Sequence, residues 1–329
     1  MIGSKGSKGR NKNTESSLVF AADLGGTHLR AATVDCEGRI HCRLKQPTPQ
    51  AEKPDDIVHA LVEAALECQR QSGAPDGAIR ALSVVVPGTV NTAEGVVIKA
   101  PNVPSLDGFR LAAALKSELA WPTYLENDAN AAALGEMWRG AARGCRTIIC
   151  VTLGTGVGGG IILDGKLWRG VDGSAAEVGH IGVDPFAGVP CTCGSRGCLE
   201  VYASATAIVR MTREARPRYP HSLLHTSEDL SSVKIYEAGM KGDELALEVF
   251  RRMGVYLGIG LATLINVLNP EMIVIGGGLA NGWELFQKHM QQQVIERAFP
   301  LPARRVRIVQ AECGDDAGLL GAARLAFTA

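Results

Sequence analysis

The chain has 329 residues, of which 46% are hydrophobic and 21% are charged. This length is enough for two domains with cores of their own, and the composition is typical of a globular protein rather than a disordered or fibrous one. Lys plus Arg and Asp plus Glu number 34 each, so no net charge favours nucleic acid or an anionic membrane surface. We expect a small-molecule partner, no nucleic acid and no membrane.

The N-terminal segment 1–17 is polar and basic and contains no apolar stretch, so it predicts neither a signal peptide nor a membrane anchor. We interpret it as a disordered tail, and contact of its few basic residues with nucleic acid is the less favoured alternative. Nine cysteines, three of them within eight residues, favour a reducing compartment where the dense group binds a metal. The expected location is the cytoplasm.

Residues 18–45 predict a β-meander of three strands, with a Gly-rich turn after the first strand and a second turn at Glu37-Gly38. The segment 55–73 predicts a helix, because its apolar residues have helical spacing, acids occupy its first turn and Gly73 ends it. Next come a predicted strand at 81–88, a helix at 106–119, a strand at 123–128 and an Ala-rich helix from 129 that Gly144 stops.

The order strand, Gly/Thr turn, strand, short turn, strand recurs in residues 147–170. The segments Leu24–Thr27 and Leu153–Gly156 occupy equivalent places in the two units. The second unit continues with a helical tract around 243–268, a strand at 271–278, a helix from Trp283, a strand at 305–312 and a last helix from Asp316. The sequence therefore predicts a duplicated α/β fold.

Two equivalent Gly-rich turns are suited to phosphate. The first contains Asp23, Gly25, Gly26 and Thr27. Its backbone N–H groups can approach phosphate oxygens without a Cβ in the way, the Thr27 hydroxyl adds a donor, and Asp23 can hold Mg²⁺ through water. A plain hairpin turn is the alternative. The second turn contains Gly154, Thr155 and Gly156. Its equivalent place favours a nucleotide held by both halves of the duplication.

The meaning of the other Gly-rich motifs depends on the elements that follow them. The run Gly154 to Gly159 matches a dinucleotide-binding pattern, but a strand follows it where that fold needs a helix. The run Gly160 to Lys166 approaches a P-loop, but Leu167 stands where Ser or Thr should bind Mg²⁺. A third turn after a predicted strand allows close approach of adenine and ribose, with a tight strand-to-helix turn as the alternative. It consists of Gly276, Gly277 and Gly278.

Asn127 and Asp128 lie where a predicted strand ends and a helix begins. Ligands of α/β folds gather at the carboxyl ends of strands. Asp128 can accept the proton of a sugar hydroxyl that attacks the γ-phosphate of ATP, and Asn127 can orient that hydroxyl. The alternative is that Asp128 only caps the helix.

The most specific signal is His180 with Cys191, Cys193 and Cys198. One imidazole and three thiolates satisfy tetrahedral Zn²⁺, whereas an iron–sulfur cluster is less favoured because no fourth cysteine is near. Four protein ligands leave no position for water, so we expect a structural zinc.

Two acids accompany the metal motif. Glu177 is spaced to share a helix face with His180, and Glu200 follows Cys198 by two residues. The metal loop can therefore present two carboxylates and an imidazole to a sugar, although either acid alone would suit a solvated surface.

The ordered motifs LGTGVGGG, GSAAEVGH and CTCGSRGCLE are similar to the signature of the ROK family of repressors and sugar kinases, particularly its bacterial glucokinase branch. The resemblance covers residues 18–329. It implies an actin-like (ribonuclease H-like) ATPase fold with two lobes around a central cleft, and a homodimer or homotetramer. The implied parts are a tail at 1–17, an N-terminal lobe at 18–130 to which the last helix, about 316–329, returns, and a C-terminal lobe at 131–315 with the zinc loop.

The resemblance also implies roles for single residues. Asp128 is the implied catalytic base, and the backbone near Gly88 lines the sugar pocket. The implied sugar ligands are Asn102, Asn127, Glu177, His180 and Glu200. His180 would bind zinc through one ring nitrogen and the sugar through the other. Family kinases often carry Asn or Lys where this chain has His28, directly after the first Gly-Gly-Thr.

The implied activity is ATP-dependent phosphorylation of a hexose in carbohydrate metabolism, with the 6-hydroxyl of glucose preferred and Mg²⁺ neutralising the phosphates. N-acetylmannosamine, N-acetylglucosamine, fructose and allose kinases share most of these residues and stay open as alternatives. A sugar-sensing repressor is the alternative from another class. It needs a helix-turn-helix, which we do not expect from the short polar segment before Leu18.

Overall fold

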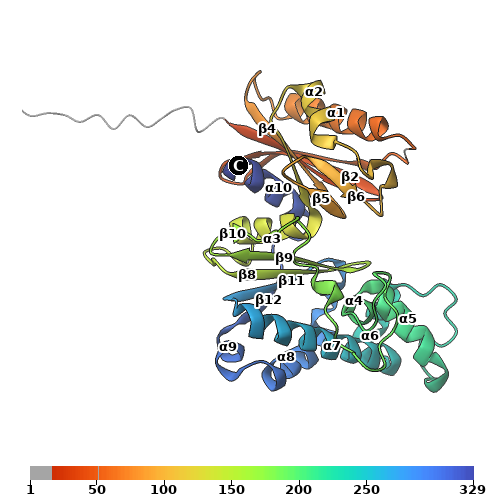
Figure 1. Ribbon diagram of the computed structural model, residues 1–329. Helices are drawn as coiled ribbons and strands as arrows, with labels where there is room; N and C mark the ends of the chain where they lie inside the picture. Colours follow the sequence, from red (N-terminus) through yellow and green to blue (C-terminus); the bar gives the residue numbers. More distant parts are fainter. Residues whose placement is uncertain (1–16, 51) are drawn as a thin grey trace, which may run out of the picture. The chain divides into compact units, whose positions relative to one another are not determined.

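The computed structural model describes residues 17–50 and 52–329. The chain divides into two units. The first contains the described residues up to Asp128 together with Ala322–Ala329, and the second contains Ala129–Gly321. Apart from Ser17, the predicted tail at 1–17 lies outside the described residues. In each unit, helices pack on a central sheet (Figure 1).

The first unit is built on a sheet with the strand order β3-β2-β1-β4-β7. Its strands are β1 (Leu18–Leu24), β2 (His28–Asp35), β3 (Ile40–Pro47), β4 (Ile79–Val86) and β7 (Thr123–Asn127). The first three pair antiparallel, as the predicted meander requires, whereas β4 pairs parallel with β1 and β7. Every residue of β4 except Arg80 is buried, as expected for a parallel strand covered on both faces.

Two helices of the first unit, α1 (Pro54–Gln71) and α2 (Leu111–Leu119), pack against each other and against the sheet (Figure 1). The helix predicted at 55–73 is confirmed, with Pro54 and two acids in its first turn. A short hairpin of β5 (Thr89–Asn91) and β6 (Val96–Lys99), followed by the 3₁₀ turn η1 (Pro104–Leu106), was not predicted.

The prediction of a helix over 106–119 is wrong at its start, because α2 begins only at Leu111. Gly108 has a φ of +74°, which an α-helix does not accommodate, and its N–H donates to Val97 O at 2.8 Å. The Asp107 carboxylate accepts the Ala100 N–H at 2.8 Å. These bonds tie the segment to β6 and its flank instead of a helix.

The second unit repeats the architecture of the first. Its sheet has the order β10-β9-β8-β11-β12, with the first three strands antiparallel and the last two parallel to β8 and β11. The strands are β8 (Ile148–Leu153), β9 (Val157–Leu163), β10 (Lys166–Leu167), β11 (Met272–Gly276) and β12 (Arg307–Gln310). Because strand order and direction match β3-β2-β1-β4-β7, the predicted duplication is confirmed.

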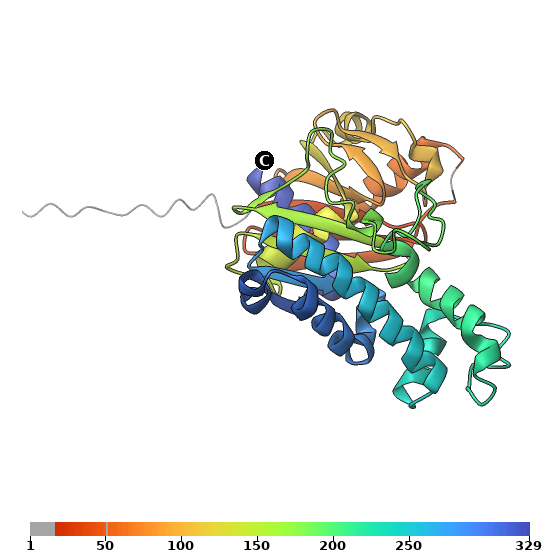
Figure 2. The same cartoon turned by 60° about the horizontal axis from the view of Figure 1, so that its bottom comes forward.

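The long helices of the second unit are α7 (Glu244–Leu268) and α8 (Trp283–Arg297), which lie side by side (Figure 2). Glycines of α7 permit this contact, because a Cβ at Gly258 would lie 2.4 Å from Met290 O. The other α-helices of the described residues are α3 (Asp128–Arg139), α4 (Glu200–Ala203), α5 (Ala205–Ala215), α6 (Ser232–Met240), α9 (Pro300–Arg305) and α10 (Ala317–Thr328). The divisions between the two units fall inside α3 and α10. The 3₁₀ turns are η2 (Val178–His180), η3 (Arg216–Arg218), η4 (Gly278–Gly282) and η5 (Gly314–Asp316).

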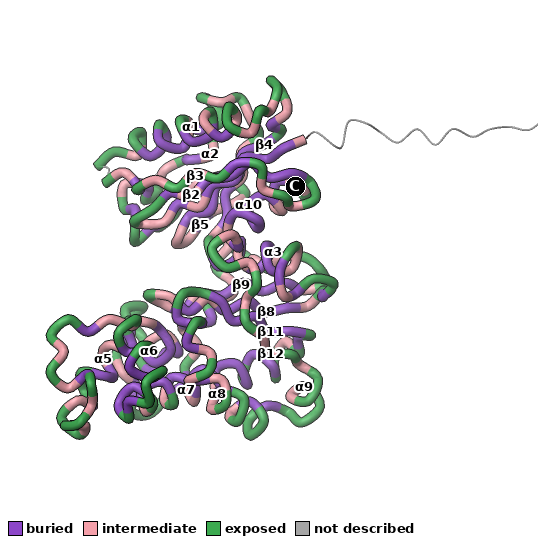
Figure 3. Tube along the Cα trace, turned by 180° about the vertical axis from the view of Figure 1, so that it is seen from behind, coloured by how far each residue is buried: buried purple, intermediate pink, exposed green. Residues whose placement is uncertain are grey.

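Burial follows the sheets in each unit. The strands next to each sheet centre are mostly buried, while the outward faces of the helices are exposed (Figure 3). Within the described residues, no helix combines the length and the apolar character that crossing a bilayer demands.

The Ala-rich helix predicted to reach Gly144 is also wrong at its end, because α3 stops at Arg139. Glu136 is fully buried, and its carboxylate accepts the N–H of Ala141 at 2.8 Å, of Glu312 at 3.1 Å and of Cys313 at 2.8 Å. After α3 the chain turns away from the helix axis, and the Ala141 N–H bonds to the Glu136 carboxylate instead of continuing the helix.

Candidate functional site

The first Gly-rich turn joins β1 to β2, and Thr48 fastens it. The Thr48 hydroxyl donates to Gly25 O at 2.6 Å, and the Thr48 N–H donates to Thr27 O at 2.9 Å. The Gly25 N–H donates to His28 O at 2.9 Å, which closes the turn. His28 therefore takes part in the turn through its backbone carbonyl.

The same turn carries Asp23 at the end of β1, where Asp23 Oδ2 lies 3.6 Å from Arg30 Nη1. A Cβ at Gly26 would lie 2.8 Å from the Cβ of Asn102. The structure thus brings the predicted phosphate turn against Asn102, which was predicted as a sugar ligand from a distant part of the chain.

Gly88, Asn127 and Asp128 meet at the carboxyl ends of the neighbouring strands β4 and β7. Asn127 Nδ2 donates to Gly88 O at 2.9 Å and to Asp128 Oδ1 at 3.0 Å. Gly88 has a φ of +128°, and a Cβ there would lie 2.1 Å from Lys99 O, so this position requires glycine. The Asn127 amide is held between a backbone carbonyl and the Asp128 carboxylate.

The second and third Gly-rich turns are adjacent, because β8 and β11 are neighbours and Gly276 pairs with β8. Gly277 has a φ of +82°, and a Cβ there would lie 2.4 Å from Leu153 O. At Gly154 and Gly278, a Cβ would meet nothing within 4 Å. Two glycine turns therefore lie side by side, with room above part of each backbone.

A hollow of about 350 Å³ lies beside Thr155 and is lined mainly by α5. Thr206 donates its hydroxyl to Thr155 O at 2.9 Å, which ties α5 to the turn. Arg213 also lines the hollow, and it makes no hydrogen bond or ion pair with the described residues. A guanidinium that lines a hollow beside a glycine turn suits an anionic ligand.

Glu200, the first residue of α4, reaches the second glycine turn. Glu200 Oε2 accepts the Val157 N–H at 3.1 Å, and a Cβ at Gly156 would lie 2.4 Å from the same oxygen. Glu177 directly precedes η2, and its Oε2 lies 3.9 Å from Nε2 of His180 at the end of that turn. The second unit thus gathers both acids, the imidazole and the glycine turn.

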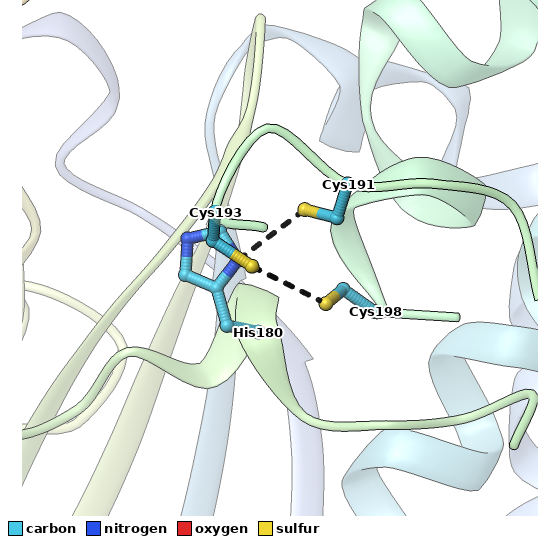
Figure 4. Close-up of side chains that lie close together, drawn as sticks. All are labelled: His180, Cys191, Cys193 and Cys198. Carbon is cyan, nitrogen blue, oxygen red and sulfur yellow. Dashed lines mark hydrogen bonds between the residues drawn. The ribbon is translucent and has the colours of Figure 1, made fainter. Parts of the chain in front are cut away.

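The four predicted metal ligands converge on one point (Figure 4). His180, Cys191, Cys193 and Cys198 each offer a ligand atom within 4.8 Å of all the others. Cys191 Sγ lies 3.6 Å from His180 Nδ1, and Cys193 Sγ lies 3.7 Å from Cys198 Sγ. A zinc tetrahedron with Zn–S of about 2.3 Å and Zn–N of about 2.0 Å has edges of about 3.8 Å between sulfurs and about 3.6 Å between sulfur and nitrogen. The donor set and its spacing fit this ion.

Protonation of the thiols opposes this binding. Burial raises the pKa of the Cys198 thiol to about 12, whereas a hydrogen bond with the backbone of Ser195 lowers the pKa of Cys193. A metal ion that takes Cys198 as thiolate displaces a proton, so metal binding weakens as the pH falls.

The model of the ROK family matches residues 19–329. The chain belongs to the ROK family. The glucokinase of Thermotoga maritima is 35% identical to this ROK chain over 311 residues, which cover 93% of the chain and 96% of that enzyme. The glucokinase of Streptomyces coelicolor is 37% identical over 318 residues, which cover 94% and 97%.

Solved ROK structures share the fold. The structure of a ROK family glucokinase from Streptomyces griseus, in complex with glucose and AMPPNP, has a TM-score of 0.78 and 35% identity. The match covers 95% of this chain and 100% of that one. The predicted actin-like α/β fold is therefore confirmed, in agreement with the two sheets of equal strand order.

Sequence reasoning missed three residues around the turns of this ROK protein. Thr48 and Thr206 bond to turn carbonyls that are 23 and 51 residues away, so no local spacing announces them. Arg213 stands in an ordinary amphipathic helix, α5, whose pattern signals only that one face is buried.

Proposed function

We propose that this protein is an ATP-dependent glucokinase, which transfers the γ-phosphate of ATP to the 6-hydroxyl of glucose. The observation that carries the proposal is the arrangement of Asp128 and Asn127 at the carboxyl ends of β4 and β7, in a chain of the ROK family. The glucokinases of two bacteria at 35% and 37% identity support glucose as the hexose.

In the proposed reaction, Asp128 is the catalytic base. The sugar hydroxyl gives its proton to the Asp128 carboxylate while its oxygen attacks the γ-phosphorus, and the bond from that phosphorus to the bridging oxygen breaks to release ADP. The Asn127 amide nitrogen donates to Gly88 O and to Asp128 Oδ1. The side-chain oxygen is the atom of Asn127 that can accept a hydrogen bond from the sugar.

The donor nucleotide is assigned to the three glycine turns. Open backbone at Gly154 and Gly278, together with the hollow that Arg213 lines, supports a place for the nucleotide in the second unit. In the first unit the turn from Asp23 to Thr27 is the proposed phosphate contact. Asp23, the residue before the last of β1, offers a carboxylate suited to hold hydrated Mg²⁺, which would neutralise charge on the phosphates.

Sugar recognition is assigned to side chains and backbone that can bind hydroxyl groups. The proposed ligands are Gly88, Asn102, Asn127, Asp128, Glu177, His180 and Glu200. Glu200 is held by the Val157 N–H, and His180 Nε2 is turned toward Glu177 while its Nδ1 faces the thiols. One imidazole can therefore serve a metal and a sugar at once.

We also propose that His180, Cys191, Cys193 and Cys198 hold one structural Zn²⁺. We expect about one zinc per chain by elemental analysis. Cys193→Ser should bind zinc more weakly, melt at a lower temperature and raise the KM for glucose by about tenfold or more, because His180 loses its anchor. Cys36→Ser, which changes an exposed cysteine outside the cluster, should match the wild type. Fully active wild-type protein without metal would refute the proposal.

The test of the kinase is ADP release with MgATP, measured across glucose, fructose, mannose, allose, N-acetylglucosamine and N-acetylmannosamine. Glucose should have the highest kcat/KM. Dominance of another sugar would keep the kinase and overturn glucose, because local contacts alone can change hexose preference by orders of magnitude. Sugar binding with no turnover for any of them would point to a sugar sensor.

A further inference from the structure

Tyr202 joins two parts of the metal loop through its hydroxyl group. The Tyr202 O–H donates to Asp184 Oδ2 at 2.9 Å, and the Val189 N–H donates to the Tyr202 oxygen at 3.1 Å. Asp184 follows His180 by four residues, and Val189 precedes Cys191 by two. The Tyr202 hydroxyl therefore connects the segment after His180 to the segment before Cys191.

Asp184 links the remaining arm of the loop. Its N–H donates to Gly197 O at 3.2 Å, directly before the ligand Cys198, and its Oδ1 accepts the Ala187 N–H at 3.3 Å. A Cβ at Gly197 would lie 2.0 Å from Asp184 O, so the two strands of the loop touch at their backbones. A shift of Asp184 would thus move both sides of the metal cluster.

Tyr202 is itself held firmly. Its side chain is buried, and its ring stacks on that of Tyr256 from α7, with centroids 3.9 Å apart and planes at 19°. It belongs to α4, which Glu200 begins. The hydroxyl therefore ties the loop to a fixed helix that also carries a proposed sugar ligand.

From these contacts we propose that Tyr202, together with Asp184, is a positioning residue for the metal loop. The Tyr202 hydroxyl holds Val189, and thereby Cys191, in place opposite His180, so it slows metal release and keeps the imidazole aligned for the sugar. This inference rests on the proposed zinc site and glucokinase activity. The spacing of the cysteines does not predict a role for Tyr202, because that role depends on its stack with Tyr256 of α7.

The test is Tyr202→Phe, which keeps the ring and its stack and removes only the hydroxyl. The Asp184 carboxylate and the Val189 N–H then lose a partner. Zinc transfer from the full-length protein to the chromogenic chelator 4-(2-pyridylazo)resorcinol should become about tenfold faster. The KM for glucose should rise by about tenfold while kcat changes by less than about twofold, because the lost alignment acts on binding.

The chain offers a matched control. Tyr256→Phe removes the hydroxyl from the other ring of the stack, and that hydroxyl makes no hydrogen bond with the described part of the chain. Its zinc release and KM should equal those of the wild type. A second pair keeps the test valid if Tyr202→Phe folds poorly. Asp184→Ala should release zinc faster than wild type, whereas Asp184→Asn keeps one oxygen that can accept from Tyr202, although not also from the Ala187 N–H, and should release zinc more slowly than Asp184→Ala.

The outcomes separate this inference from the functions on which it rests. Wild-type protein without zinc would overturn the metal site and the inference together. Zinc-bound wild type with unchanged release in both Tyr202→Phe and Asp184→Ala would overturn the inference alone. Faster release without kinase activity in the wild type would overturn the glucokinase and leave the positioning of the loop supported.

Discussion

Asp128→Asn is expected to lower kcat by about a thousandfold, a loss of about 4 kcal/mol in transition-state stabilisation. The carboxamide has the shape of the carboxylate and can still accept the Asn127 Nδ2–H, now 3.0 Å from Asp128 Oδ1, but it cannot take a proton from the sugar hydroxyl. The dissociation constant for glucose, measured by titration calorimetry, should change by less than about threefold, because binding and proton transfer are separate tasks.

Asp164→Asn is the matched control for this substitution. Asp164 lies in the turn between β9 and β10 with a φ of +50°, a conformation that Asn adopts readily. The control should keep wild-type turnover. If Asp128→Asn kept more than about a tenth of kcat, Asp128 would not be the base. If the variant lost glucose binding as well as turnover, Asp128 would be a binding residue only.

Glu136→Ala should lower the free energy of unfolding by about 3 to 5 kcal/mol. The carboxylate accepts three backbone N–H groups, from Ala141, Glu312 and Cys313, in a fully buried place. Removing it leaves these donors without a partner and opens a cavity. Equilibrium unfolding in urea, followed by far-UV circular dichroism, measures the change.

Glu312→Ala is the control, because it changes a side chain next to the Glu136 carboxylate but keeps the backbone N–H that the carboxylate binds. The Glu312 side chain is exposed and its backbone N–H is unchanged by the substitution, so stability should stay within about 0.5 kcal/mol of the wild type. A loss below about 1 kcal/mol for Glu136→Ala would mean that water replaces the carboxylate, and that the end of α3 is held by other contacts.

Local patterns predicted most of the fold. The glycine turns, the two meanders and the metal ligands each lie within a short segment of the sequence. Turns and strand alternation depend on neighbouring residues, so such features can be predicted locally. Thus the cluster of Cys191, Cys193 and Cys198 was readable without a structure. The boundaries of α2 and α3 were not, because they depend on Gly108 and Glu136.

Contacts between distant segments explain those failures. Glu136 ends its helix by binding the backbone of Cys313, which lies 177 residues further along the chain. Thr48 and Tyr202 act through the same kind of remote contact, with Gly25 O in one case and with a stacked ring of α7 in the other. Single-sequence periodicity carries no record of such pairs, whereas the contacts decide how the site residues are held.

The division of the chain has a consequence for the order in which the protein folds on the ribosome. The first unit includes Ala322–Ala329, whereas the second is one uninterrupted stretch, Ala129–Gly321, with the division falling inside α10. During synthesis the second unit is therefore complete before the first, although the first begins earlier. The strands β1–β4 and β7 are therefore made long before the last segment of their unit, and chaperones that bind exposed apolar strands can act on them in that interval.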